Sequence, residues 1–260
     1  MSTQPSAASR TLTLAGTEVA RIGLGTNRLR STPENHALLR EAVEAGVGLI
    51  DTAHGYTSGD SERVIGEALL PAPELLVVAT KGGYSGGSRE ELRAQIEQSL
   101  ERLRTDAIDL YYLHRVDPAT PLEESLGAIA EYREAGKIKE VGISAVDVGQ
   151  VETARKVLPI AAVQNHYNVT ERSSDEVVDY CEENGIVFVP YYPLRGDRPA
   201  ALREIAESHG ASDEQIALAW LLHRSPVMLP IPGTLSIEHL RENLGALDLE
   251  LSADDFDALA

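Results

Sequence analysis

Short apolar, β-branched runs alternate with amphipathic stretches along almost the whole chain. Apolar runs of this length that end at a polar residue are typical of strands buried in a parallel sheet. Between them, apolar residues recur at helical spacing, as in residues 90–103 and 121–135. The pattern predicts eight strands, at residues 21–26, 47–52, 75–81, 108–114, 138–144, 160–165, 186–192 and 227–231.

Helix start and stop signals agree with this alternation. Proline follows threonine at Thr32-Pro33 and Thr120-Pro121, which predicts proline at the first position of two helices. Glycine follows four helical runs, at positions 46, 136, 185 and 210. Eight strands separated by helices favour parallel pairing through right-handed crossovers. We therefore expect an α/β fold, a single (β/α)8 TIM barrel. A doubly wound open sheet is the alternative, but it usually has fewer strands per domain.

Four further segments add to the barrel. Residues 11–20 alternate around Ala15-Gly16 and predict a hairpin that plugs the bottom of the barrel. Two helical runs, 199–209 and 212–224, lie between the last two strands, and the run 252–260 opens with acidic residues, as helix starts often do. We expect residues 1–10 to form a flexible tail and residues 11–260 to form one domain.

Composition narrows the function classes. The 260 residues include 41 Asp and Glu against 23 Lys and Arg, which gives a formal net charge of -18. An acidic surface argues against a nucleic-acid or membrane-surface partner. The single cysteine, Cys181, excludes an internal disulfide and suits a reducing compartment. No apolar run could span a bilayer, and the first residues lack the apolar core of a signal peptide. We expect a cytoplasmic monomer.

Four side chains suited to proton transfer follow the ends of three successive predicted strands: Asp51, Tyr56, Lys81 and His114. A parallel barrel gathers such strand ends at one face, where active sites form. A free phenol, with a pKa near ~10, is a weak acid at pH 7. An ammonium at roughly 4 Å would lower that pKa by about three units, with burial opposing part of the effect. Asp51 would keep Lys81 charged, and His114 could donate to a substrate oxygen.

The segments that carry these residues are DTAHGY with SERVIGEAL, VVATK and DLYYLHRVD. They resemble the signature segments of the aldo-keto reductase family, and the similarity continues through VGIS, VQNHYN, VPYYPL and IPGTLSIEHLRENL. Within the family, the chain looks most like the compact bacterial members related to pyridoxal reductases. The resemblance implies reduction of an aldehyde or ketone by a nicotinamide cofactor. It implies Tyr56 as the general acid, Lys81 and Asp51 as its tuning pair, and His114 as the group that orients the carbonyl.

The resemblance also implies a cofactor that lies extended across the barrel mouth without a Rossmann domain. The sequence agrees with the absence of a Rossmann domain. Its glycine-rich candidate, Gly23-Leu24-Gly25, has Arg28 where the G-x-G-x-x-G fingerprint requires a third glycine. We expect NADPH, with NADH as the alternative, and no metal. The implied binding residues are Gly25 and Thr26 at the ribose, Ser144 and Gln164 at the carboxamide, Tyr191 on the nicotinamide, Leu194 to Gly196 at the pyrophosphate, Gly233 and Thr234 at the adenosine phosphate, and Glu242 and Asn243 at the adenine.

The chain departs from the family pattern at two places. Ala145 follows Ser144 where the family often has asparagine, so one hydrogen bond to the carboxamide is missing or comes from another residue, with Asn165 as the candidate. The pocket for the 2′-phosphate usually carries a lysine and an arginine, and those positions are Gly233 and His239 here. Arg241 is the candidate replacement, because the pocket needs a guanidinium or an ammonium.

The substrate side is less defined. The loops after the strands are short, so we expect an open mouth that admits a small carbonyl compound. Candidates to line it are Tyr84, His54, Tyr167, Asn168 and Tyr192.

Three other functions compete with the reductase interpretation. A metal-dependent hydrolase would use His54, His114 and His166, but the chain has no H-x-H pair. A glycosidase would need paired carboxylates, whereas strands four and seven end at His114 and Tyr191. A slow, cofactor-binding subunit that senses redox state for a partner is the third alternative.

Overall fold

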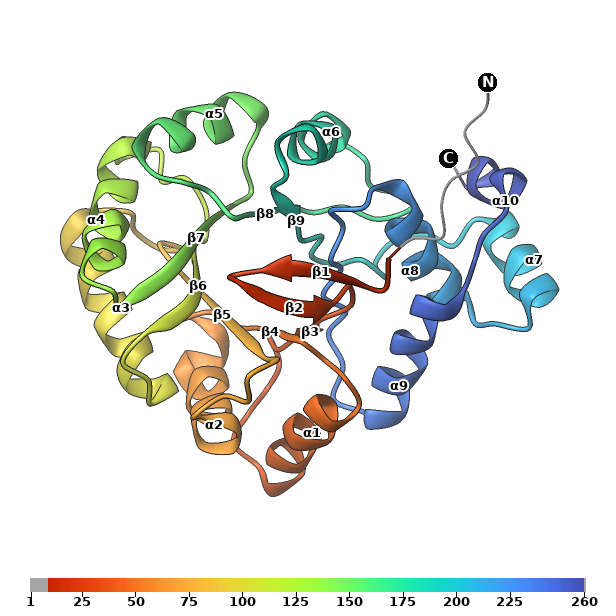
Figure 1. The fold of residues 1–260 in the computed structure, drawn as a ribbon, viewed down its shortest axis with the longest axis horizontal. Helices are drawn as coiled ribbons and strands as arrows, with labels where there is room; N and C mark the ends of the chain where they lie inside the picture. The colour runs from red at the N-terminus through yellow and green to blue at the C-terminus, as the bar shows by residue number, and fades with distance from the viewer. Residues whose placement is uncertain (1–8, 260) are drawn as a thin grey trace.

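The computed structural model describes residues 9–259, and its centre is a parallel sheet that curls into a barrel (Figure 1). Each strand pairs with the next one along the chain, as right-handed β–α–β crossovers require. The seven strands are β3 (Leu24–Gly25), β4 (Leu49–Asp51), β5 (Val77–Gly82), β6 (Ile108–Leu113), β7 (Ile138–Ser144), β8 (Ala162–Gln164) and β9 (Val187–Phe188). The tail prediction falls mainly on residues 1–8, which lie outside the described residues.

The eighth predicted strand closes the barrel with an incomplete hydrogen-bond ladder. Residues 227–231 run beside β9, where the N–H of Leu229 donates to the carbonyl of Phe188 at 2.8 Å. On the other side, the carbonyl of Pro230 accepts from the N–H of Gly23 at 2.9 Å, and the carbonyl of Pro232 accepts from the N–H of Gly25 in β3 at 3.2 Å. Proline has no N–H to return these bonds, so only isolated bridges form here. The (β/α)8 barrel is confirmed.

The predicted hairpin is present and covers one end of the barrel. Strands β1 (Thr11–Leu14) and β2 (Thr17–Ala20) pair antiparallel through a turn at Ala15 and Gly16, and in Figure 1 they cross the middle of the ring of helices. Leu14 and Val19 belong to the cluster of apolar side chains inside the barrel. A Cβ at Gly48 would lie 2.7 Å from the Val19 Cβ, so glycine allows the hairpin to sit this close.

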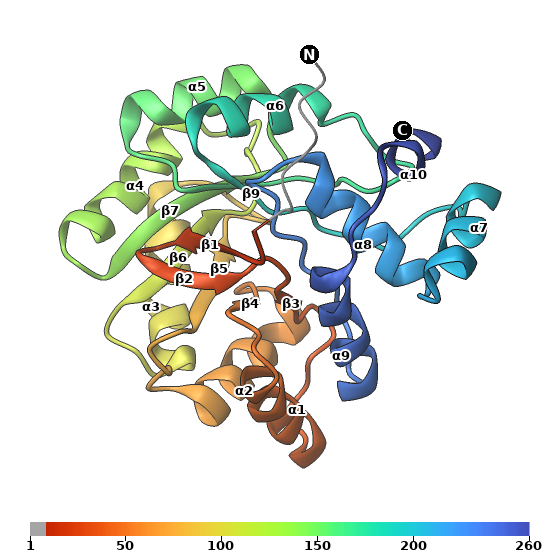
Figure 2. The same ribbon diagram turned by 45° about the vertical axis from the view of Figure 1, so that its right-hand side comes forward.

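Helices surround the sheet, as the amphipathic stretches predicted. Figure 2 shows α7 and α10 beside α8, on one side of the barrel. The helices are α1 (Pro33–Glu44), α2 (Asp60–Leu69), α3 (Arg89–Leu103), α4 (Leu122–Glu134), α5 (Val148–Val157), α6 (Asp175–Asn184), α7 (Ala200–His209), α8 (Asp213–Arg224), α9 (Ile237–Gly245) and α10 (Ala253–Ala258), with two short 3-10 turns, η1 (Tyr56–Gly59) and η2 (Ala246–Asp248).

Local capping explains where these helices begin. Pro33 is the first residue of α1, with Thr32 as its cap, as predicted. Pro121 instead precedes α4 as its cap, one position earlier than predicted. Glycine at positions 46, 136, 185 and 210 takes positive φ angles, from 61° to 100°, just after a helix, which confirms the stop signals.

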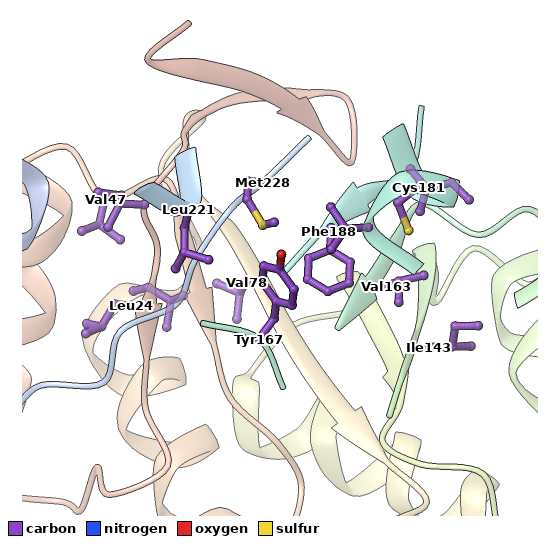
Figure 3. Close-up of a cluster of buried hydrophobic side chains, with 14 of the residues drawn as sticks. Leu24, Val47, Val78, Ile143, Val163, Tyr167, Cys181, Phe188, Leu221 and Met228 are labelled. Carbon is purple, nitrogen blue, oxygen red and sulfur yellow. The ribbon is translucent and has the colours of Figure 1, made fainter. Parts of the chain in front are cut away.

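A second apolar layer fills the space between the sheet and the helices. Figure 3 shows part of it, with Val163 and Phe188 from the strands beside Cys181 from α6. Strand β5 is buried at every position, which explains why its sequence is apolar on both faces. Among residues 9–259, no helix is long and apolar enough to cross a membrane.

Candidate active site

The alternation of side chains along the barrel strands places the predicted site residues. Inner apolar residues of the strands belong to the cluster inside the barrel, and the residue two positions further points to the same side. These pairs of inner residue and site residue are Leu49 and Asp51, Ala79 and Lys81, Tyr112 and His114, Ala162 and Gln164, and Val189 and Tyr191. Strand periodicity therefore gathers polar groups in one ring at the carboxyl end of the barrel.

Lys81 lies at the centre of this ring and is fully buried. Its Nζ donates to Asp51 Oδ1 at 2.5 Å, to the Thr52 carbonyl at 2.8 Å and to the Tyr56 hydroxyl at 3.4 Å. The other carboxylate oxygen of Asp51 accepts from Gln164 Nε2 at 2.8 Å. All three ammonium hydrogens therefore have acceptors, and one of them is the phenol oxygen.

Tyr56 begins the η1 turn, and its ring faces both Lys81 and His114. Lys81 Nζ lies 4.9 Å from the centre of the Tyr56 ring, and the His114 ring meets it edge-on with centroids 5.9 Å apart. Thr57 and Ser58, the next residues, take positive φ angles of 48° and 58°. Such angles are costly for residues other than glycine and persist where surrounding contacts enforce them.

Buried charges behind the site enforce that turn. Arg102 Nη1 donates to the His54 carbonyl at 3.0 Å and to Glu62 Oε2 at 3.2 Å. Glu62 also accepts from Thr80 Oγ1 at 2.6 Å, and Thr80 directly precedes Lys81. This network joins the Tyr56 turn to the lysine strand. Sequence reasoning missed it, although Glu62 stands within the SERVIGEAL segment.

The expected net lowering of the Tyr56 pKa is not found. Burial raises the pKa of Tyr56 above its ordinary value, and the positive charge of Lys81 offsets only part of that effect. The reason is that Asp51 neutralises Lys81 and itself disfavours a phenolate. Burial opposes the charge of Lys81, yet Asp51 and Tyr56 together raise the pKa of Lys81. The lysine therefore remains an ammonium at neutral pH.

His114 is neutral at physiological pH. Burial lowers its pKa to about 3, with the positive charges of Lys81 and Arg115 adding to the effect. A neutral imidazole can donate one N–H bond to an oxygen atom but cannot supply a proton at pH 7. The Tyr56 phenol, whose pKa is raised, is protonated at the same pH.

A cavity of about 530 Å³ opens directly above these residues. Its wall combines small residues, aromatic rings and amide or hydroxyl groups, a composition typical of ligand sites. The lining residues are Gly25, Thr26, Asn27, Asp51, Gly55, Tyr56, Tyr84, His114, Arg115, Ser144, Ala145, Gln164, Tyr191, Tyr192, Ile231 and Gly233.

Three of the four catalytic candidates line this cavity: Asp51, Tyr56 and His114. Six of the cofactor-binding residues that the resemblance implies line it as well: Gly25, Thr26, Ser144, Gln164, Tyr191 and Gly233. Leu194 and Gly196 line a neighbouring pocket. The remaining four lie further along the chain, Thr234 before α9 and Arg241, Glu242 and Asn243 within α9. Arg241 is exposed on 62% of its side-chain surface and lies 3.6 Å from Glu41.

The cavity residues fit a nicotinamide. Tyr191 stacks parallel to His166, with centroids 5.5 Å apart, which fixes the orientation of its ring. Gln164 uses its Nε2 on Asp51, so its Oε1 remains able to accept from an amide. Glycines at positions 25 and 233 let two backbone segments approach each other at the edge of the cavity. The donor set therefore suits an aromatic amide ring with an extended tail.

Other sequence candidates lie elsewhere. Tyr167 is fully buried, stacked on Trp220 and packed against Phe188 (Figure 3), so its expected place at the mouth is wrong. The Asn165 side chain bonds both backbone groups of Val146 and therefore does not replace the missing asparagine at the carboxamide. Asn165 directly follows Gln164, the last residue of β8, whose side chain lines the cavity.

The histidines proposed as metal ligands do not converge. His54 Nε2 pairs with Gln98 at 2.9 Å, His114 faces Tyr56, and His166 lies against Tyr191. Within residues 9–259, no group of three or more His, Cys, Asp or Glu side chains could hold a metal ion. The hydrolase alternative therefore lacks a ligand set in the described part of the chain.

Comparison with known proteins agrees with this geometry. The model of the aldo/keto reductase family matches residues 21–198 and 197–260. The chain is 37% identical to pyridoxine 4-dehydrogenase of Escherichia coli, covering 95% of this chain and 96% of the relative. It is 38% identical to an uncharacterized oxidoreductase of Schizosaccharomyces pombe, covering 85% of this chain and 76% of the relative.

Solved structures show the same architecture. A thermostable aldo-keto reductase in complex with the inhibitor epalrestat superposes with a TM-score of 0.88 at 34% identity, covering 96% of this chain and 98% of that one. An aldo/keto reductase of Klebsiella pneumoniae, solved with NADP and acetate, gives 0.87 at 28% identity, covering 96% and 94%. Sequence and fold agree over nearly the full length, and the chain belongs to the aldo/keto reductase family.

Proposed function

We propose that the protein reduces an aldehyde or ketone to an alcohol with NADPH, and that Tyr56 is the proton donor. The observation that carries the proposal is the partly buried contact of the Tyr56 hydroxyl with Lys81, whose charge Asp51 holds in place. Family membership supports the reaction class, and the two Klebsiella pneumoniae structures solved with NADP or NADPH support the cofactor.

Each polar residue has a distinct task in this proposal. When bound, reduced nicotinamide supplies a hydride to the carbonyl carbon. Neutral His114 donates a hydrogen bond to the carbonyl oxygen and sets its position. Tyr56 transfers its proton to the same oxygen as negative charge develops there. Lys81 stabilises the phenolate that remains, and Asp51 with Gln164 fixes the lysine.

Replacement of Tyr56 by phenylalanine tests the assignment of the acid. The substitution removes one oxygen atom and retains the ring packing, so we expect unchanged affinity for NADPH and a loss of roughly 10²- to 10⁴-fold in kcat. Cofactor fluorescence measures the affinity, and oxidation of NADPH measures turnover on a panel of aldehydes that includes pyridoxal. A variant with most of the wild-type rate would show that another group delivers the proton. Wild-type protein that oxidises only one equivalent of cofactor would favour the redox-sensing alternative.

We further propose that Arg241 contributes to the choice of NADPH over NADH. It lies on α9 near Glu242 and Asn243, and its only ion pair among the described residues is a long contact with Glu41. Replacing Arg241 by alanine should weaken NADPH by about tenfold and leave NADH nearly unchanged, because only NADPH carries the 2′-phosphate. Equal effects on both dissociation constants would remove Arg241 from this role.

A further inference from the structure

The mouth of the cavity carries an arginine that the proposed chemistry does not use. Arg115 directly follows His114 and lines the same cavity as the catalytic candidates. Its guanidinium lies over the ring of Tyr84, 4.5 Å from the centroid, and the same ring lies 5.0 Å from His114. Tyr84 itself is exposed on 58% of its surface. A cation and an open aromatic face thus stand beside the group that would hold the carbonyl.

Arg115 has no carboxylate within 4.0 Å among residues 9–259, in a chain with 41 acidic and 23 basic residues. Some exposed arginines are paired, such as Arg89 with Glu131 and Arg104 with Glu67, whereas others, such as Arg40, have no such partner among the described residues. Arg115 acts electrostatically on Asp117, but it is only a minor cause of the lowered pKa of that carboxyl. The main causes are the backbone N–H bonds that Asp117 accepts from Ala119 and Gly87. What distinguishes Arg115 is its place, because it is the one arginine or lysine among the residues that line the described cavity.

Stacking prepares the guanidinium for an anion. A guanidinium that lies on a tyrosine ring keeps its N–H edges free and loses side-chain freedom before a ligand arrives. Those edges match the two oxygens of a carboxylate or phosphate. Arg115 and His114 line the same cavity, so one small ligand there can contact both groups.

Two other cations near the cavity stand at its cofactor side. Arg28 donates to the carbonyl of Gly233 at 3.3 Å, and Arg195 lies over Tyr192 beside the pocket lined by Leu194 and Gly196. Lys81 is neutralised by Asp51. Arg115 is thus the cation on the substrate side of the described cavity.

We propose that Arg115 binds an anionic group of the substrate, so that the preferred substrates are carbonyl compounds that carry a carboxylate or a phosphate. The inference rests on the proposed reductase function. It assigns Arg115 to specificity: the anion is held at the rim while the carbonyl lies between His114 and Tyr56. An aromatic substrate would gain further contact with Tyr84.

Matched substrates test this role. The first pair is 4-formylbenzoate and its neutral methyl ester, and the second is 4-formylphenyl phosphate and 4-methoxybenzaldehyde. Wild-type protein should have a kcat/KM at least about fivefold higher for each anion, mostly through KM, and the ratio should fall as salt is added. The size of each ratio tells whether carboxylate or phosphate is preferred. Arg115→Gln should lower kcat/KM for the anionic substrates at least about fivefold more than for their neutral partners, whereas Arg40→Gln, a change at an exposed arginine of α1, should retain the preference.

The outcomes separate this inference from the proposed function. Reduction of all four compounds at equal efficiency, or an equal loss on charged and neutral substrates in Arg115→Gln, would overturn the role of Arg115 while the reductase remains. Failure of wild-type protein to reduce any of them, or pyridoxal, would count against the proposed function itself.

Discussion

At the scale of single residues, the site depends on one ammonium with three fixed acceptors. Lys81 contacts Asp51, Thr52 and Tyr56 at once, so its position is set by the fold and not by a ligand. A preorganised charge stabilises a phenolate without rearrangement during the reaction. In the protein without ligand, burial dominates and the Tyr56 pKa is raised, so the acid is held in its protonated form.

The neutral state of His114 makes stability depend on pH. Its pKa falls to about 3 in the folded protein, while an unfolded histidine has a pKa near ~6.5, so the unfolded chain takes up the proton first. The contribution of His114 to stability is complete above about pH 6.5 and is lost as the pH falls toward 3. We expect a loss of about 1.5 kcal/mol between pH 6.5 and pH 5.

Urea unfolding at several pH values measures this effect in wild-type protein and in His114→Gln. The variant should have a flatter dependence of the unfolding free energy on pH, because glutamine does not titrate. Parallel curves for the two proteins would mean that folding leaves the pKa of His114 unchanged.

The sequence predicted which residues come together, but it did not predict the direction of the Tyr56 pKa shift. Strand periodicity was sufficient to bring Asp51, Lys81 and His114 to one ring. The direction of the Tyr56 pKa depends on burial and on the distance between Asp51 and Lys81, and neither follows from spacing along the chain. Arg115 was overlooked because a residue next to a strand end can point toward the mouth or toward solvent.

At the scale of elements, the hairpin and the closing segment complete the barrel in different ways. The hairpin was predictable from its alternation and its turn residues, since both are local signals. The closing segment, residues 227–231, was predicted as a strand. Because Pro230 and Pro232 have no N–H, their carbonyls accept hydrogen bonds from the β3 side but no bonds are donated in return. Its place is therefore set by packing of Met228, Leu229 and Ile231 more than by a ladder.

Truncation of the hairpin core tests whether this element stabilises the barrel. Leu14 is 2% exposed and packs inside the barrel end, so Leu14→Ala should lower the free energy of unfolding by about 2–4 kcal/mol. Leu75, with 70% exposure, is the matched control, and its alanine variant should change stability by less than about 0.5 kcal/mol. Similar urea midpoints for the two variants would mean that the hairpin is only loosely attached.

At the scale of the whole molecule, the larger of the two apolar clusters joins the strands to the surrounding helices. Trp220, the single tryptophan, is buried in α8 and stacks on Tyr167 and on Phe256 of α10. The fluorescence of Trp220 therefore reports on the side of the barrel where α8 packs against α10. Such contacts support the prediction that residues 11–260 form a single domain.

Unfolding followed by two signals tests that prediction. Fluorescence of Trp220 and far-UV circular dichroism should give coincident urea transitions if the chain unfolds as one cooperative unit. A fluorescence transition that clearly precedes the loss of helix signal would indicate that the segment around α8 and α10 unfolds separately.

The most direct test of the central claim is the rate of hydride transfer as a function of pH, measured in single turnovers. In wild-type protein the rate should fall once the pH exceeds the pKa of Tyr56, since only the protonated phenol can donate. In Lys81→Met the fall should move to higher pH, because the charge that favours the phenolate is gone. In Tyr56→Phe the rate of hydride transfer should be low and should not change with pH over the same range. Superimposable profiles for the three proteins would contradict the account.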